Sequence, residues 1–197
     1  MSPRVDVAEE RRTQIIEAAI ACLAREGYHR TTMDDIVHAS GLSKGALYWY
    51  FPSKEDLFLA ILDVWMRELQ EATAPADAQA PTPQQLRAWV EAFTRFAEMD
   101  PGRVRLIVEF WAEVHRSRAI DQRLGELCRQ RALPLVRIIE QGIARGELRP
   151  VDAFAVAHTF LAVYDGLLLQ RILLPDHLPW PQVNQTAIDV LLNGLQA

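Results

Sequence analysis

The chain has 197 residues, half of them hydrophobic, with a formal net charge of −5 and two cysteines. This length is enough for one or two domains with hydrophobic cores, and the low cysteine count excludes a small disulfide-held scaffold. The charge excludes a strongly basic nucleic-acid binder, since residues 1–54 are neutral and the rest of the chain carries the acidic excess. The N-terminal residues lack an apolar signal region, and polar residues interrupt the most apolar stretch, 154–174. We therefore expect a cytoplasmic protein without a membrane span.

Apolar residues recur at helical spacing along the chain, whereas no strand pattern or internal repeat appears, which predicts an all-α fold. The first helix is expected over residues 7–26, and Gly27 ends it. An alanine- and proline-rich segment, 72–83, is expected to be an exposed connection. Cys22 and Cys128 lie within helical patterns and are expected to be buried as small apolar side chains. The helices expected after Pro52 cover residues 53–69, 84–99, 104–115, 118–145, 151–174 and 182–195.

Two short helices joined by a glycine turn are predicted in the first third of the chain. Thr32 followed by Asp35 is typical of a helix N-terminus, where a side-chain oxygen accepts a free backbone N–H and an acid suits the positive helix end. Gly41 permits a tight turn, Ser43 can cap the second helix, and Pro52 ends it. Two helices this short, held at an angle by a glycine turn, predict a helix-turn-helix.

The second of these helices, residues 44–50, carries groups suited to DNA. Its N-terminus offers free N–H groups and a positive dipole end to a phosphate, and Lys44 adds a charge. Three aromatic residues follow in a row, and because successive helical side chains point about 100° apart, at least one ring must face outward. An outward ring beside a lysine suits a phosphate–sugar wall or a thymine methyl group. Leu47 and Phe51 are instead expected in the core.

The sequence GLSKGALYWYFPSKEDLF resembles the DNA-binding signature of the TetR family of bacterial transcriptional regulators, and GYHRTTMDDIVHASG is similar to the segment before it. The resemblance implies a three-helix DNA-binding head, a longer all-helical body, a homodimer, and release from double-stranded DNA when a small molecule binds the body. We accordingly expect a helix-turn-helix DNA-binding domain at residues 1–53. A C-terminal helical bundle for ligand binding and dimerisation is expected at residues 54–197.

The same resemblance assigns roles to individual residues. The positions at which family members contact phosphates are occupied here by Thr32, Ser43, Lys44, Tyr48, Tyr50 and Lys54. The positions of backbone or base-edge contacts are occupied by Gly45, Ala46 and Trp49. Trp49 departs from the family pattern, in which a smaller or hydroxylated ring is common, so its role is less well defined than that of Tyr48.

The last two long helices are the expected dimer surface. Residues 154–174 are apolar around much of the helix, which indicates burial on more than one side, and residues 182–195 present a broad apolar face. The alternative is that both helices complete the core of a monomer. A dimer fits the expected function, because one short reading helix covers a single half-site and two are needed on a near-palindromic operator.

A ligand pocket is expected in the body. Small-molecule sites usually have apolar walls and a few polar anchors. The side chains expected to bind an unidentified, largely apolar effector are Trp65, Trp89, Phe93, Val108, Trp111, His115, His158 and Tyr164. For each aromatic residue the alternative is ordinary core packing, and for His158 an internal hydrogen bond.

The chain contains no recognisable catalytic motif. The histidines lack metal-ligand spacing, and no nucleophile elbow, P-loop or dinucleotide fingerprint is present. Glu109 and Glu113 share a helix face that could hold a surface metal ion, but a solvated face is the favoured interpretation. We therefore expect no enzyme activity, metal or cofactor. An architectural or division-control DNA-binding protein of the same fold, without a small-molecule effector, is the alternative to a ligand-responsive repressor.

Overall fold

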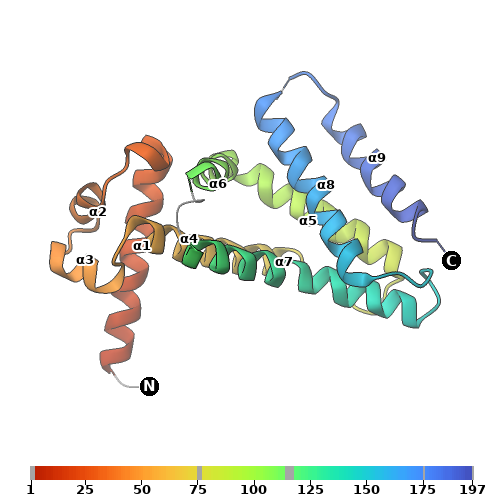
Figure 1. Ribbon diagram of the computed structural model, residues 1–197, viewed down its shortest axis with the longest axis horizontal. Helices are drawn as coiled ribbons and strands as arrows, with labels where there is room; N and C mark the ends of the chain where they lie inside the picture. Colours follow the sequence, from red (N-terminus) through yellow and green to blue (C-terminus); the bar gives the residue numbers. More distant parts are fainter. Residues whose placement is uncertain (1–2, 75–76, 114–117, 175, 197) are drawn as a thin grey trace. The chain divides into compact units, whose positions relative to one another are not determined.

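The computed structural model describes residues 3–74, 77–113, 118–174 and 176–196, with side chains outside residues 3–6, 101, 111–113 and 118–120. Apart from an isolated bridge between Leu148 and Gln196, its regular structure is helical, which confirms the predicted all-α fold (Figure 1). The helices are α1 (Pro3–Arg30), α2 (Met33–Ser40), α3 (Lys44–Tyr50), α4 (Lys54–Ala72), α5 (Thr82–Met99), α6 (Pro101–Glu113), α7 (Arg118–Ala144), α8 (Ala153–Leu173) and α9 (Trp180–Asn193).

Two helix starts differ from the predicted ones at prolines. Helix α6 begins at Pro101, where the helical pattern was expected to break, and α5 carries Pro83 in its first turn. Proline suits the first turn because its missing N–H would have no acceptor within the helix there. Helix α7 runs through Pro134 without ending. A proline in this sequence can therefore mark the start of a helix or lie inside one.

The expectation that both cysteines are buried is wrong for Cys128. Cys22 is 1% exposed within α1, whereas Cys128 is exposed on α7 directly after the buried Leu127. Neighbouring residues of a helix point about 100° apart, so the inward direction of one turns the next towards solvent. Both cysteines are free thiols.

The chain forms two compact units. The first unit comprises the chain up to Trp65 together with Arg105–Arg123, and the second comprises Met66–Val104 together with Leu124 onwards. Helices α4, α6 and α7 therefore each contribute residues to both units. The functional boundary expected between residues 53 and 54 stays a prediction, since compactness alone does not define a function.

The first unit contains α1, α2, α3 and the beginning of α4 around one core. At its edge the ring of Tyr28 lies 5.2 Å from Phe58 and 5.3 Å from Phe110, edge-on to both, while the latter two rings stack 4.3 Å apart. These contacts join the end of α1 to α4 and α6. Other core side chains of the head, all under 5% exposed, include Ile15, Ile16, Ala19, Leu23, Ile36, Leu47, Phe51, Leu57 and Ile61.

The second unit packs α5, α7, α8 and α9 around a larger core. Helices α5 and α7 approach closely at Gly142, where an added Cβ would lie 2.6 Å from Cγ2 of Thr82 and 2.9 Å from Cδ1 of Leu148. Only glycine allows this separation of the two helices. The core side chains include Leu86, Trp89, Val90 and Phe93 of α5, Ala132, Leu135 and Ile139 of α7, Phe160, Leu161 and Tyr164 of α8, and Ile188 and Leu192 of α9.

Helix α8 is the one helix of the described residues whose length and composition would allow it to cross a membrane. A core helix has the same composition, and α8 buries Phe160, Leu161 and Tyr164 inside the second unit. Its Asp165 forms an ion pair with Arg131 of α7. These contacts make α8 a core helix whose outer side remains apolar.

Candidate nucleic-acid interface

The helix-turn-helix is set by short-range hydrogen bonds that the sequence indicated. The hydroxyl of Thr32 accepts the N–H of Asp35 at 3.2 Å, and the Asp35 carboxylate accepts the N–H of Thr32 at 2.8 Å. Hydrogen bonds from Thr32, that of the hydroxyl more than that of the N–H, lower the pKa of Asp35. Gly41 follows α2 with φ at 68°, the left-handed conformation that glycine adopts without strain. Two reciprocal bonds and one glycine therefore start and stop α2.

Helix α3 is anchored by one buried side. Ser43 caps it by accepting the N–H of Ala46 at 3.2 Å. Leu47 is fully buried and Phe51 is 4% exposed, so both pack into the head as expected. The N–H of Phe51 donates to the carbonyl of Leu47 at 2.9 Å before Pro52 ends the helix. The opposite side of α3 is consequently left to solvent.

The exposed side of α3 carries the three consecutive rings. Trp49 is 74% exposed and Tyr48 is 40% exposed, unusual values for aromatic side chains. The rings of Trp49 and Tyr50 meet edge-on, with their centroids 4.6 Å apart. Burial of such rings against a second molecule would remove a large apolar area from water. The sequence argument that at least one ring must face outward is confirmed for two of them.

Lys44 at the start of α3 forms an ion pair that sequence reasoning missed. Its ammonium lies 2.7 Å from the carboxylate of Asp34 on α2, and both side chains are 62% exposed. The hydrogen bond to Asp34 raises the pKa of Lys44. The ammonium also lies 6.0 Å from the centroid of the Tyr48 ring. An acid thus sits beside the cation expected to contact a phosphate.

Lys54, which is expected to contact a phosphate, donates hydrogen bonds within the head. Its ammonium bonds the carbonyl of Tyr28 at 2.7 Å and that of Thr31 at 3.1 Å, and lies 4.3 Å from the centroid of the Tyr28 ring. These contacts hold the connection between α1 and α2. A phosphate contact from Lys54 remains a prediction, and the fold gives this residue a structural role that local sequence did not indicate.

The residues expected to bind an effector fall in different parts of the chain. Trp65 and Val108 belong to the first unit, and Trp65 packs on Phe58 at 6.1 Å. The side chain of Trp111 and the whole of His115 lie outside the described residues.

The other four expected effector residues belong to the second unit, and three of them converge. The rings of Trp89 and Phe93 stack 5.2 Å apart, and Phe93 meets Tyr164 edge-on at 6.4 Å. We call these three residues the aromatic cluster. The fourth, His158, packs against Phe154 of its own helix at 4.4 Å.

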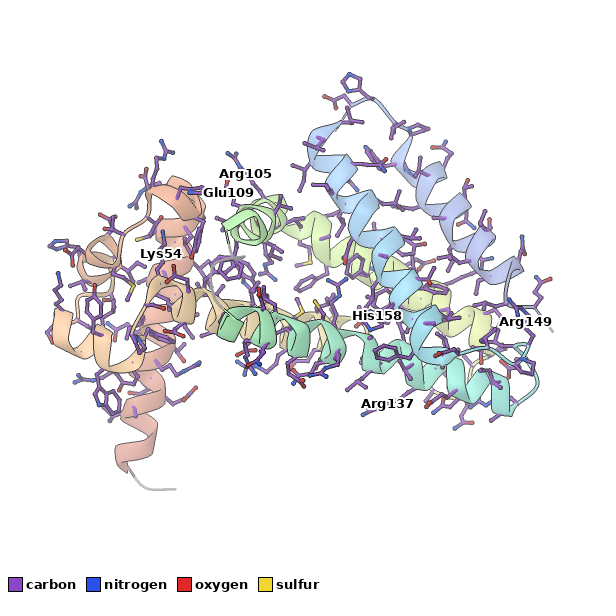
Figure 2. The ribbon with its side chains drawn as sticks, in the orientation of Figure 1. Lys54, Arg105, Glu109, Arg137, Arg149 and His158 are labelled. Atoms are coloured by element: carbon purple, nitrogen blue, oxygen red, sulfur yellow. The ribbon has the colours of Figure 1, made fainter. Side chains whose placement is uncertain are left out.

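Two polar atoms of the expected effector residues are buried without partners. Within the described part of the chain, Nε1 of Trp89 and Nε2 of His158 have no hydrogen-bond partner. Figure 2 shows His158 on its helix. Burial raises the pKa of Tyr164, so its hydroxyl stays neutral. The guanidinium of Arg131 lies 5.9 Å from the centroid of the Phe93 ring. Unpaired buried polar atoms are costly, and a bound ligand is one way in which proteins satisfy them.

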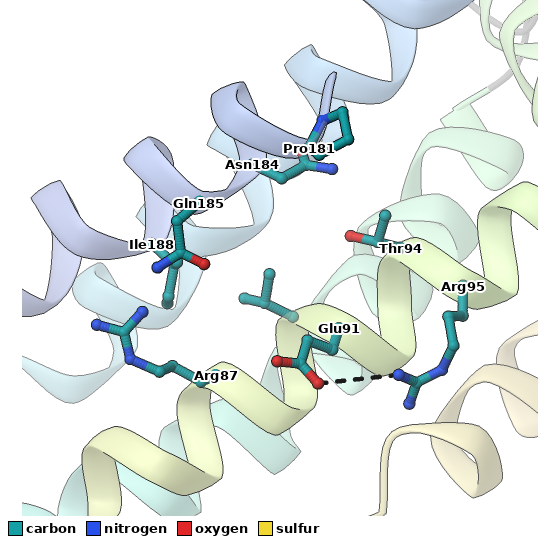
Figure 3. Close-up of a pocket in the computed structure, with 9 residues that line it drawn as sticks. Arg87, Glu91, Thr94, Arg95, Pro181, Asn184, Gln185 and Ile188 are labelled. Carbon is teal, nitrogen blue, oxygen red and sulfur yellow. Dashed lines mark ion pairs between the residues drawn. The ribbon is translucent and has the colours of Figure 1, made fainter. Parts of the chain in front are cut away.

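A cavity of about 280 Å³ opens between α5 and α9 of the second unit (Figure 3). Arg87 bonds Asp189 at 2.6 Å, and the amide of Gln185 bonds the same carboxylate, which fixes one wall. The hydrogen bond from Arg87, and to a lesser extent the one from Gln185, lowers the pKa of Asp189. None of the six expected effector residues whose side chains the structure describes lines this cavity. Its lining consists of Arg87, Val90, Glu91, Thr94, Arg95, Pro181, Asn184, Gln185 and Ile188.

Both halves of the chain match known families of bacterial regulators. Residues 15–61 match the family described as bacterial regulatory proteins, tetR family, and residues 82–195 match the C-terminal part of BetI-type transcriptional repressors. The second match alone spans more than half of the chain. The chain belongs to the TetR family.

Individual TetR-family proteins resemble the chain over most of its length. The HTH-type transcriptional regulator YfiR of Bacillus subtilis is 31% identical over 85% of this chain and 84% of its own. TtgR of Pseudomonas putida, also an HTH-type transcriptional regulator, is 31% identical over 86% of this chain and 83% of its own. The solved structure of Salmonella enterica GusR superposes with a TM-score of 0.75 at 28% identity, covering 93% and 96% of the two chains. The protein is therefore a helix-turn-helix transcriptional regulator.

The described residues contain no group of three or more histidine, cysteine, aspartate or glutamate side chains arranged to hold a metal ion. Glu109 is only partly solvated, because its side chain is 23% exposed and its carboxylate accepts the backbone N–H of Tyr28, whereas the side chain of Glu113 lies outside the described residues. The spacing of Glu109 and Glu113 carried no signal for this long-range contact.

Proposed function

We propose that this TetR-family protein is a cytoplasmic, dimeric repressor that binds double-stranded DNA and is released by a small, largely apolar molecule. The observation that carries the proposal is the solvent-facing side of α3, where Tyr48 and Trp49 are exposed next to Lys44. Leu47 and Phe51 hold the other side of α3 in the core. A short helix with a rigid buried side and an aromatic, cationic outer side suits insertion into a major groove.

Specific contacts follow from the geometry of α3 and its surroundings. The hydroxyl groups of Tyr48 and Tyr50 and the ammonium of Lys44 suit phosphate oxygens on either side of the groove, and Trp49 suits a base edge or a thymine methyl group. The complete set of proposed DNA-contacting residues is Thr32, Ser43, Lys44, Gly45, Ala46, Tyr48, Trp49, Tyr50 and Lys54.

A homodimer through α8 and α9 would bring two reading helices to a near-palindromic operator. Both helices expose large apolar side chains, with Leu173 67% exposed and Val190 65% exposed. Phe154 and Leu169 of α8 are 48% and 40% exposed. Apolar surface at two adjacent helices of one unit is typical of a protein–protein interface.

We place the effector site in the second unit, at the aromatic cluster and the adjoining α5–α9 cavity. The hydroxyl of Tyr164 lies 3.4 Å from the carbonyl of Asn184, whose side chain lines the cavity. Val90 and Ile188 separate the cavity from the core and are themselves buried. Apolar walls with one or two polar anchors fit a small, largely apolar effector.

The match of residues 82–195 to BetI-type repressors favours a ligand-responsive body over an architectural DNA-binding protein. By linkage, an effector can weaken DNA binding only by its own preference for the state that does not bind DNA. Release of the protein from its operator by a metabolite would support the repressor, and indifference to every metabolite tested would support the architectural alternative.

The test of this function is binding to the DNA upstream of the protein's own gene, followed by footprinting. A protected near-palindrome is expected, and the double variant Lys44→Ala/Tyr48→Ala should lose it while remaining a dimer of unchanged helicity. Arg129→Ala, which removes an exposed cation of α7, is the control and should keep wild-type affinity. Unchanged binding by the double variant would show that α3 is not the reading helix.

A further inference from the structure

The connection between α1 and α2 contains a break whose backbone is held by distant side chains. Gly27 leaves the helical conformation, with φ at 81° and ψ at 169°. Residues other than glycine rarely adopt this φ. After the break the chain continues through Tyr28 to Thr31 and then to Thr32, which caps α2. Any force on this short connection therefore acts directly on the first helix of the helix-turn-helix.

Glu109 of α6 bonds the backbone at this break. Its Oε2 accepts the N–H of Tyr28 at 2.9 Å, although the two residues are 81 positions apart. A Cβ on Gly27 would lie 3.1 Å from the same oxygen, so the glycine also permits the close approach. The other oxygen, Oε1, accepts Nε of Arg105, one helical turn earlier, at 3.1 Å (Figure 2). The carboxylate is thereby oriented towards the break from two sides.

The carbonyl of Tyr28 is held by a second helix. Lys54, the first residue of α4, donates to it at 2.7 Å and to the carbonyl of Thr31 at 3.1 Å. The ring of Tyr28, 3% exposed, packs on Phe58 of α4 and Phe110 of α6. One peptide segment is thus clamped by a cation from α4 and an anion from α6. Both helices continue from the first unit into the second.

We propose that Glu109 is a positioning residue for the DNA-binding head. Its bond to the Tyr28 N–H lets α6, as well as α4, set the position of the connection that precedes α2 and α3. Loss of this bond would free the connection and leave α2 and α3 less precisely placed for a specific operator. Arg105 orients the carboxylate from the exposed side and is not required for the bond.

The test compares three full-length variants, and its DNA measurement rests on the proposed function. Glu109→Ala removes the acceptor, Glu109→Gln keeps an acceptor oxygen of the same reach, and Arg105→Ala removes only the exposed partner. Affinity for the footprinted operator is measured beside affinity for a random duplex of the same length. Amide hydrogen exchange of residues 27–32 is measured on the same proteins without DNA.

The expected results separate positioning from folding. Glu109→Ala should lower operator affinity about tenfold, the scale of one lost bond to a charged acceptor, while binding to the random duplex changes less than about twofold. Exchange of residues 27–32 should rise in this variant. Glu109→Gln and Arg105→Ala should both remain within about threefold of wild type for the operator.

Wild-type operator affinity and wild-type exchange of residues 27–32 in Glu109→Ala would overturn the proposal. Equal loss of operator and random-duplex binding would also overturn it, because that result means a damaged head. If Glu109→Ala does not fold, a tenfold loss in Glu109→Gln without a rise in exchange would count against the proposal. If the wild type binds no specific operator, the proposed function fails, and the exchange measurement still decides the role of Glu109.

Discussion

The ion pair between Lys44 and Asp34 predicts a measurable effect on the salt dependence of DNA binding. The two charges lie 2.7 Å apart on α3 and α2, and both side chains are mostly exposed. In the free protein Asp34 neutralises Lys44. On DNA the lysine must exchange this carboxylate for a phosphate, and Asp34 then faces a negatively charged backbone. We therefore expect Asp34 to restrain operator binding and Lys44 to promote it.

The size of the expected change in salt dependence follows from counterion release. Each phosphate that a protein cation neutralises contributes about 0.9 to the slope of log affinity against log salt. Lys44 occurs once in each reading helix, so the variant Lys44→Met in a dimer should make this slope shallower by about 1.8. Over a fourfold rise in salt, from about 50 to about 200 mM, this difference amounts to roughly a twelvefold change in relative affinity. Asp34→Asn should instead raise operator affinity several-fold, most clearly at low salt.

The assay is fluorescence anisotropy with a labelled operator duplex at four or more salt concentrations. The raised pKa of Lys44 keeps the side chain charged throughout the neutral range, so one buffer near pH 7 suffices. Arg129→Met, which removes an exposed cation of α7, is the matched control and should leave the slope unchanged. An unchanged slope for Lys44→Met would show that this lysine does not reach a phosphate. Weaker binding by Asp34→Asn would show that the acid orients the lysine instead of competing for it.

Three further predictions concern the second unit. Gly142→Ala should destabilise the protein by about 1–3 kcal/mol in chemical denaturation, because the added Cβ would lie 2.6 Å from the side chain of Thr82. Gly125→Ala, on the same helix with open space around it, should stabilise the protein by up to about 1 kcal/mol. Equal effects of the two substitutions would refute the packing argument. Hydrogen bonds from Thr82, that of its backbone N–H first, lower the pKa of Glu147 below the ordinary value of 4.5. The stability that Glu147 contributes is therefore present above pH 4.5 and lost as the pH falls through the lower folded pKa. The melting temperatures of wild type and Glu147→Gln should differ at pH 7 and converge in acid, and a constant difference would contradict this. Val190→Arg should shift the protein from dimer to monomer in light scattering, whereas Met99→Arg, at an 83% exposed residue of α5, should not.

Local sequence predicted the parts of the head that depend on near neighbours. The caps at Thr32 and Ser43 and the turn at Gly41 involve groups within a few residues of each other, so residue type alone indicated them. The outward direction of the rings on α3 followed from helical geometry and from the burial of Leu47. The family signature lies in this same segment, which is why function was predictable from it.

Contacts between distant segments were not predictable in this way. Nothing near Glu109 or Lys54 in the sequence marks the backbone of Tyr28 as a hydrogen-bond partner of either side chain. Cys128 was assigned to the wrong side of its helix, since a single small residue does not reveal the direction of a helical face. Among the residues with described side chains, none of the aromatic ones expected to bind the effector lines the cavity between α5 and α9.

The sequence by itself therefore determined the helical fold, the helix-turn-helix and the TetR family, because caps, turns and helical periodicity act over fewer than ten residues. Only the tertiary structure decided which charged side chains are held inward and where the body is hollow. The clamp on Tyr28 forms only when α4 and α6 pack beside the end of α1. The cavity forms only when α5 and α9 pack together. Both depend on side chains that meet from segments tens of residues apart, and spacing along the chain carries no information about such meetings.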